Sequence, residues 1–312
     1  MNDDAVAPVI AVMLILAALV TFLTVWNAVY VPSMKQSSEV EHLRNVESAF
    51  LHLASDIERV VSARQDHMTL CEPVQMGGGD FIFDTLRSGG SLSVHNEQKP
   101  VYNITLTSET GATLGRVNGT LVTISYDPVG NFWQDQGYQW QHGYINVTKH
   151  GSHKTPLGYY NMTDVTNEIS GSGSLSAFAR SFGSVDYTVN QSALPGNCSR
   201  LVLHAINLST TPGHSFASGN GFGSVRLNSR VNRTYYCPGA NVSVVSIGSG
   251  GTLFGNATLD GWNASLAASA RACGGTVKYS SGSSVDVAYS IGNGIDPVEI
   301  LLSTTTIEVG VY

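Results

Sequence analysis

The sequence predicts an α+β protein: a long apolar and then amphipathic helix at the N-terminus, followed by a large β-rich, sandwich-like extracellular body. The position of glycine is the first observation. The chain has 33 glycines, and the first of them is Gly77. Because glycine weakens helix interiors and favours turns, we expect helix from Ala5 to about Asp66 and a turn-rich body after it.

Residues 1–34 predict a helix that crosses a membrane or packs in the core of a filament. No charged residue lies between Ala5 and Met34, and the apolar run is longer than the about 20 residues that a bilayer core requires. Trp26 and Tyr30 lie near its outer end, where such rings favour the membrane interface. The start Met-Asn-Asp-Asp lacks the positive region of an ordinary secretory signal. The side chains expected to face lipid or the filament core are Val9, Ile10, Val12, Leu14, Leu16, Leu19, Phe22, Leu23 and Trp26.

Residues 35–67 predict an amphipathic helical stem. Apolar residues recur at steps of three and four, which is the helical period, and we expect this stripe to pack at least partly on the body. Pro32 is expected to kink or interrupt the join between the two helices. If the helix is continuous, it reaches roughly 90 Å at 1.5 Å per residue. The stripe consists of Val40, Leu43, Val46, Phe50, Leu53, Ile57 and Val60.

The remaining chain is expected to contain a linker with the first strands at residues 68–100 and a β-rich region at 101–312. One later segment, Leu259–Cys273, has helical character. A boundary between two modules is possible near residues 171–176, where an ordinary loop is the alternative. The expected strands are Val101–Leu106, Thr120–Tyr126, Gly143–Val147, Val185–Val189, Leu201–Ile206, Ser224–Val231, Val242–Ile247, Thr276–Tyr279, Val285–Ile291 and Val298–Val311.

Asn-X-Ser/Thr sequons are far more frequent than chance predicts. Since N-linked glycans are added outside the cytoplasm, this excess predicts an extracellular, glycosylated body. Glycans would also keep soluble a chain of which only 12% is charged. Lys35 and Arg44, which follow the apolar helix, weakly favour the opposite orientation. The sequons begin at Asn103, Asn118, Asn146, Asn161, Asn190, Asn197, Asn207, Asn232, Asn241, Asn256 and Asn263.

All four cysteines follow the apolar helix, and an even number outside the cell predicts two structural disulfides. Proximity in the sequence suggests Cys237 with Cys273, which leaves Cys71 for Cys198. Three connectivities stay open. The absence of a Cys-X-X-Cys spacing disfavours zinc and redox sites.

The run from Asp3 to Leu16, Asp-Asp-Ala-Val-Ala-Pro-Val-Ile-Ala-Val-Met-Leu-Ile-Leu, resembles the N-terminal segment of archaeal type IV pilin-like proteins. Ala7 and Ala11 stand where that family commonly has serine and glycine. The run from Asn45 to Phe50 also resembles the stem of membrane-anchored archaeal surface proteins. The resemblance covers about the first 65 residues.

The resemblance implies recognition by a pilin-type signal peptidase, insertion as a single membrane span, and use of assembly machinery to pack many copies into a homo-oligomeric filament. Asp3 and Asp4 would then neutralise a neighbour's terminal amine or lie solvated at headgroup level. The basic and small residues that precede a pilin cleavage point are absent. The chain is therefore either already processed or retained in the membrane as an anchored surface glycoprotein.

No sequence motif predicts an enzyme. The chain lacks a nucleophile elbow, a zinc-protease helix, a phosphate-binding loop, a dinucleotide fingerprint and an EF-hand loop. The net charge of -7 without a basic patch excludes nucleic acid as an expected partner. We expect a non-enzymatic filament subunit without cofactor or metal. The alternatives are an anchored adhesin and a tethered carbohydrate-active enzyme.

Three groups of residues could carry chemistry, and for each of them we expect an ordinary structural role. The histidines lack a fourth zinc ligand, the aromatic rings favour a sandwich core over a sugar platform, and the carboxylates have no spacing that singles out a glycosidase pair. These groups are His142, His150 and His153; Trp133, Trp140, Tyr138 and Tyr144; and Asp80, Asp84, Asp260 and Asp286.

Overall fold

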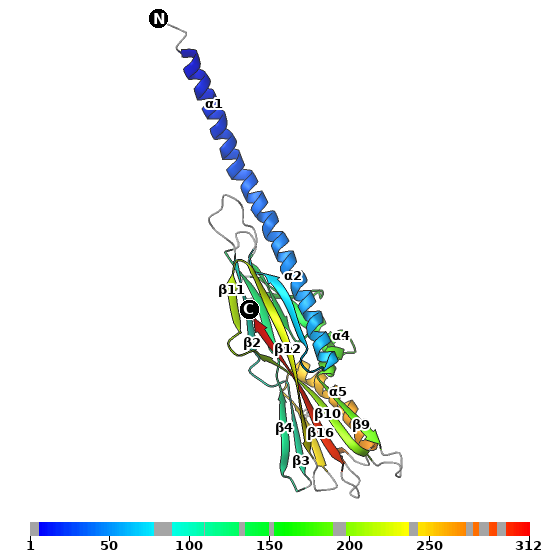
Figure 1. Cartoon of the computed structure of the whole chain (residues 1–312). Coiled ribbons are helices and arrows are strands. Elements are labelled where there is room, and N and C mark those ends of the chain that lie inside the picture. Colours follow the sequence, from blue (N-terminus) through cyan, green and yellow to red (C-terminus); the bar gives the residue numbers. More distant parts are fainter. Residues whose placement is uncertain are drawn as a thin grey trace.

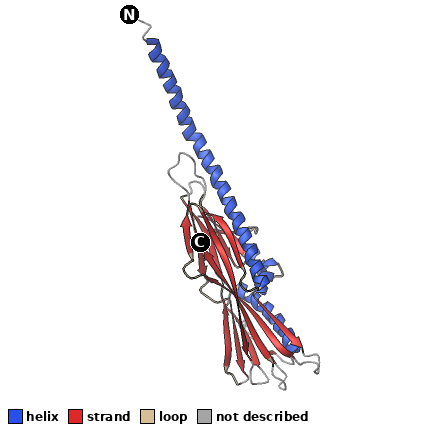
Figure 2. Ribbon diagram, viewed as in Figure 1, coloured by secondary structure: helices blue, strands red, loops and turns tan. Residues whose placement is uncertain are grey.

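The computed structural model shows a long helix that projects from an elongated β-rich body (Figure 1). Figure 2 shows the same separation of helix and strand. The expected α+β class is therefore confirmed. The structure describes residues 6–77, 89–108, 110–130, 135–149, 153–189, 198–236, 243–272, 277–280, 287–291 and 298–312.

The N-terminal rod consists of α1 (Val6–Val25), a π-helical turn η2 (Trp26–Tyr30) and α2 (Val31–Ala63), which follow one another without a break. The expected interruption at Pro32 is absent. Proline has no N–H for the preceding turn, and its ring crowds the carbonyl four residues earlier. The wider π turn, in which the Val31 N–H donates to the Trp26 carbonyl, accommodates the ring.

The first sheet, called sheet A, has the strand order β1-β12-β16-β10-β9. β10 pairs with β16 in parallel, and the other pairs are antiparallel. Buried side chains alternate along β12, as expected for a sheet with one covered face. The bounds are β1 (Thr69–Gln75), β9 (Gly183–Val189), β10 (Cys198–Thr210), β12 (Phe222–Tyr236) and β16 (Glu299–Val311).

Sheet B has the order β11-β2-β5-β6-β7-β8, and all its pairs are antiparallel. His142 and Gly143 both have positive φ and form the tight turn between β6 and β7. The bounds are β2 (Gly89–Asn96), β5 (Val122–Val129), β6 (Gln136–Gln141), β7 (Tyr144–Lys149), β8 (His153–Pro156) and β11 (Phe216–Gly219).

Sheet C has the order β14-β15-β13-β3-β4 and is antiparallel. Three helices complete the body: α3 and α4 connect sheet B to sheet A, and α5 connects two strands of sheet C. The bounds are β3 (Tyr102–Ser108), β4 (Thr113–Gly119), β13 (Ser243–Ser249), β14 (Val277–Ser280), β15 (Val287–Ile291), α3 (Met162–Ser170), α4 (Ser174–Ser181) and α5 (Leu253–Ala272).

All ten strands expected from the sequence are present, with shifted ends, and the late helical segment occurs as α5. Strands β1 and β2 lie at residues 68–100, where a linker with the first strands is expected. Four further strands and two helices were not expected: β4, β6, β8, β11, α3 and α4. Residues 171–173 form the turn between α3 and α4. Each sheet combines strands from both sides of this turn, so the structure shows a connection there and no division into two sequential modules.

The stem stripe packs on the body as expected. Of its seven apolar residues, only Val40 is not fully buried. Phe50 is fully buried, and its ring lies 6.0 Å from the ring of Tyr138 on β6. Burial of each such side chain stabilises the fold by about 1.5–3 kcal/mol, so the lower half of the rod is an integral part of the core.

Candidate functional site: the projecting apolar helix and the surface of the body

Among the described residues, no strand or helix of the body packs on the apolar helix α1. Side chains on every side are about half exposed or more, from 50% at Val25 to 66% at Leu14. The apolar window has a mean hydropathy of 2.7, and none of it is buried. The helix is long and apolar enough to span a membrane. Of the nine side chains expected to face lipid or a filament core, eight are exposed and Trp26 is partly covered.

The two polar side chains within the described part of α1 form hydrogen bonds to the backbone of the same helix. The Thr21 hydroxyl donates to the Ala17 carbonyl at 2.7 Å, and the Thr24 hydroxyl donates to the Val20 carbonyl at 2.7 Å. A hydroxyl bonded in this way costs little in an environment without water. The helix therefore presents an apolar surface that suits lipid or a neighbouring helix.

Aromatic rings follow one another at the outer end of α1. The centroid of Trp26 lies 6.1 Å from that of Phe22 and 5.2 Å from that of Tyr30, with which it stacks. Residues four apart share a helix face, so the three rings form one aromatic stripe. This stripe spans the junction between the apolar helix and the polar stem.

Polar contacts from distant parts of the chain fix the stem to sheet B. His42 Nε2 lies 2.8 Å from the Tyr126 hydroxyl, and the Tyr138 hydroxyl donates to Glu47 Oε2 at 3.0 Å. The partners are 84 and 91 residues apart in the sequence. No local pattern could have revealed these contacts.

A second anchor lies at the lower end of the stem. Arg64 has a left-handed backbone (φ 49°), and its guanidinium donates to the Ser184 hydroxyl and, at 3.1 Å, to the Ser181 carbonyl. Burial lowers the pKa of Arg64, and the nearby Asp186 partly offsets this effect. The contact ties the end of the rod to the junction of α4 and β9, so the rod and body form one unit.

The stem contact at His42 is expected to make stability depend on pH. Burial lowers the pKa of His42 below its usual 6.5, and Glu39 only partly offsets this. The unfolded chain therefore takes up the proton first, and the free energy of unfolding should fall as pH drops through about 6.5, levelling off below the lowered pKa. Urea unfolding between about pH 8 and pH 5 should show a smaller fall for His42→Gln than for the unaltered chain. Identical slopes would contradict this role.

The sequons differ widely in accessibility. Asn118, Asn161 and Asn232 are exposed, Asn103, Asn207, Asn256 and Asn263 are half-buried, and Asn190, Asn197 and Asn241 lie outside the described residues. Asn161 caps α3: its side-chain oxygen accepts a hydrogen bond from the Asp164 N–H at 3.0 Å. The side-chain nitrogen of Asn161, to which a glycan would be attached, takes no part in this bond. Asn146, on β7, is 1% exposed. The expectation of a glycan at Asn146 is incompatible with this burial.

We expect Asn146 to be unmodified in folded protein from the native cell. A glycan cannot enter a core packed to the density of an organic crystal. Peptide mass spectrometry should find the Asn146 peptide bare and the Asn232 peptide carrying a glycan. A glycan on Asn146 in folded material would contradict the position of β7.

The cysteine arrangement differs from the expected pairing. Cys71 is an exposed free thiol, so it is not bonded to Cys198, and that part of the disulfide prediction is wrong. Cys198 is buried and disulfide-bonded. Cys237 and Cys273 lie outside the described residues, and among the described residues no complete disulfide is present. The stem is instead fixed to the body by burial and polar contacts.

The histidines, aromatic residues and carboxylates that could carry chemistry are dispersed or buried where the structure describes them. His142 Nε2 lies 2.9 Å from Glu97 Oε1, and its ring stacks on Phe254. His153 is exposed on β8, and no group of three metal-binding side chains occurs among the described residues. Tyr138, Trp140 and Tyr144 are buried, which rules out a surface sugar platform built from them. Asp260 is exposed on α5, while His150, Trp133, Asp80, Asp84 and Asp286 lie outside the described residues.

The paired side chains of Glu97 and His142 link the turn between β6 and β7 to the segment after β2. Burial would raise the pKa of Glu97, but hydrogen bonds from His142 and Gln141 lower it overall. The sequence does not predict this pair, because the two residues are 45 positions apart. The Glu97–His142 pair holds the β6–β7 turn against α5, where the His142 ring stacks on Phe254.

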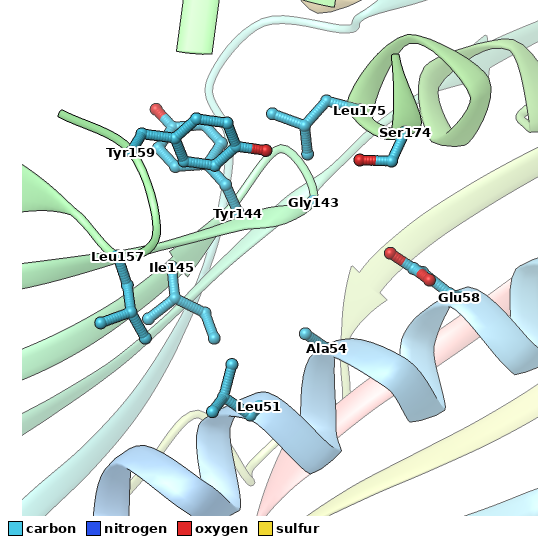
Figure 3. A pocket seen from close by; sticks show the side chains of 10 residues that line it. All are labelled: Leu51, Ala54, Glu58, Gly143, Tyr144, Ile145, Leu157, Tyr159, Ser174 and Leu175. Atoms are coloured by element: carbon cyan, nitrogen blue, oxygen red, sulfur yellow. The ribbon is translucent and has the colours of Figure 1, made fainter. Parts of the chain in front are cut away.

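One small cavity of about 160 Å³ lies where α2, the β6–β7 turn and α4 meet (Figure 3). Its walls are mostly apolar, with the carboxylate of Glu58 and the hydroxyl of Ser174 at its polar side. The Ser174 hydroxyl donates to Glu168, and none of the ten described lining residues is a histidine, so this serine has no base of that kind beside it. The lining residues are Leu51, Ala54, Glu58, Gly143, Tyr144, Ile145, Leu157, Tyr159, Ser174 and Leu175.

Comparison with known proteins identifies no relative: no family model, no curated protein and no solved structure matches the chain significantly.

Proposed function

We propose that this chain is a structural subunit of an extracellular filament of the type IV pilin kind. The apolar helices of many copies would pack as the filament core, and the β-rich bodies would form its outside. The observation that carries this proposal is the projecting helix α1, which is apolar on every side and is not covered by any described part of the body from Val9 to Val25.

The physical reason is the free energy of exposing such a helix to water. Each Å² of apolar surface costs about 25 cal/mol in water, so α1 needs a permanent cover. Lipid provides that cover before assembly, and identical helices provide it afterwards. A head-to-tail contact between copies that does not close into a ring generates a helical filament.

Exposed sequons on the body support the proposal that the body lies outside the cell. Asn118, Asn161 and Asn232 are exposed sequons, and glycans there would keep a charge-poor surface soluble. The partners in this proposal are other copies of the chain, the membrane before assembly, and a pilin-type signal peptidase with its assembly machinery. N-terminal sequencing of the protein from cells tests the processing step.

A second candidate is a single-span surface glycoprotein, such as an adhesin, that remains in the membrane. The 20 residues of α1 span about 30 Å, the thickness of a bilayer core. The ring stack of Trp26 and Tyr30 then lies where aromatic residues favour the interface.

Electron microscopy of material sheared from the cell surface separates the two candidates. The filament proposal predicts regular fibres that bind an antibody against the body. If the chain instead stays with the membrane fraction and the fibres are unlabelled, the anchored glycoprotein replaces it.

A further inference from the structure

Sheet A has an open edge along the lower half of β12. β1 pairs with β12 only from Phe222 to Asn228. β16 pairs with the other side of β12 from Val225 to Tyr236. From Ser229 onward, no strand among the described residues lies on the β1 side of β12.

The direction of the backbone groups shows which ones face this edge. The Ser229 N–H donates to the Met68 carbonyl, the Ser229 carbonyl accepts from the His67 N–H, and the Val231 N–H donates to Asp66 Oδ1 at 2.9 Å. Backbone groups alternate in direction along a strand. The N–H and carbonyl groups of Arg233 and Tyr235 therefore face the open edge, where no described strand pairs with them.

An edge of this kind can template pairing with another chain. Asn232, Arg233 and Thr234 are exposed, and Tyr235 is 55% exposed. The segment from Val231 to Tyr236 is rich in β-favouring side chains. Proline, lysine and bulges, which commonly protect an edge, do not occur along it, and only Arg230 and Arg233 add charge.

We propose that an N-linked glycan on Asn232 covers this open edge and prevents copies of the chain from pairing through it. The inference rests on the glycosylation included in the proposed function. The Asn232 Nδ2 forms a bond to C1 of a sugar while the bond from C1 to a lipid-linked phosphate breaks, and the amide proton is released. The co-substrate is therefore a lipid-linked phosphorylated oligosaccharide.

Sheet C shows the same arrangement. Among the described strands, β4 pairs only with β3, at the edge of the sheet, and it carries the exposed Asn118. Asn161 offers a contrast because it is the N-cap of α3 and does not lie on a strand. Sequons on open strand edges can therefore be compared with an exposed sequon at the start of a helix.

The test uses the full chain from its native glycosylating cell, solubilised in detergent so that α1 is covered whether or not filaments form. Thr234→Val removes the Asn232 sequon and keeps a β-branched residue on β12. We expect its dissociation constant for self-association to fall by roughly tenfold or more through added strand hydrogen bonds. Sedimentation velocity measures the association, and infrared absorption reports intermolecular β-structure.

Two variants make the test specific. Thr163→Val removes the glycan at Asn161 and should leave the chain monodisperse. Thr234→Val combined with Tyr235→Pro lacks the Asn232 glycan and also the outward N–H of residue 235, so it should remain monodisperse. If Thr234→Val associates no more than Thr163→Val, or if Asn232 proves bare in the native protein, the inference is overturned, whatever microscopy shows about filaments.

Discussion

Replacing Leu16 by glutamate is expected to abolish assembly and to weaken retention in the membrane. Leu16 lies in the middle of α1 and is 62% exposed, so it faces whatever covers the helix. A charge in the centre of a membrane helix costs about 3 kcal/mol on the insertion scale. This corresponds to a loss of roughly a hundredfold or more in the equilibrium constant of insertion or packing.

The measurement is the amount of the chain in the sheared fraction and in the membrane fraction, by immunoblot. Leu253→Glu is the matched control, because Leu253 is 48% exposed at the start of α5, where an acidic residue suits the helix. It should leave both amounts unchanged. Normal assembly of Leu16→Glu would show that α1 is not covered by apolar surface.

Phe50→Ala is expected to cost about 3–5 kcal/mol of folding free energy. The Phe50 side chain is fully buried between the stem and sheet B. Its loss leaves a cavity beside Tyr138, where α2 packs on sheet B. Urea unfolding of the detergent-solubilised chain, followed by tryptophan fluorescence, measures the change.

Leu51→Ala is the neighbouring control. Leu51 follows Phe50 on the same helix and is 49% exposed, so its truncation should cost less than about 1 kcal/mol. Equal losses for the two variants would contradict the docking of the stem through the Phe50 face.

The parts of the fold that were predictable from the sequence rest on local patterns. The rod follows from an uncharged run and a helical stripe, and the ten expected strands follow from β-favouring segments between turn residues. The strands that were not expected have weaker local signals. β4 contains Gly115 and Gly119, and β8 and β11 have only four residues each. These segments are strands because a partner strand lies beside them.

The surface of the body was predictable only in part, for a related reason. Asn146 and Asn232 head the same motif, yet one lies in the core and the other at a sheet edge. Accessibility depends on tertiary packing, which a three-residue motif does not contain. The pairing of Cys71 failed similarly, because spacing along the chain says little about distance between strands.

The most direct test of the central claim is to identify what touches α1 in the cell. A photoreactive amino acid at position 19, in place of Leu19, would be irradiated in intact cells and its products analysed by immunoblot and mass spectrometry. The account predicts covalent dimers joined between α1 helices of two copies. Adducts with lipid alone, in cells that carry surface filaments, would contradict it.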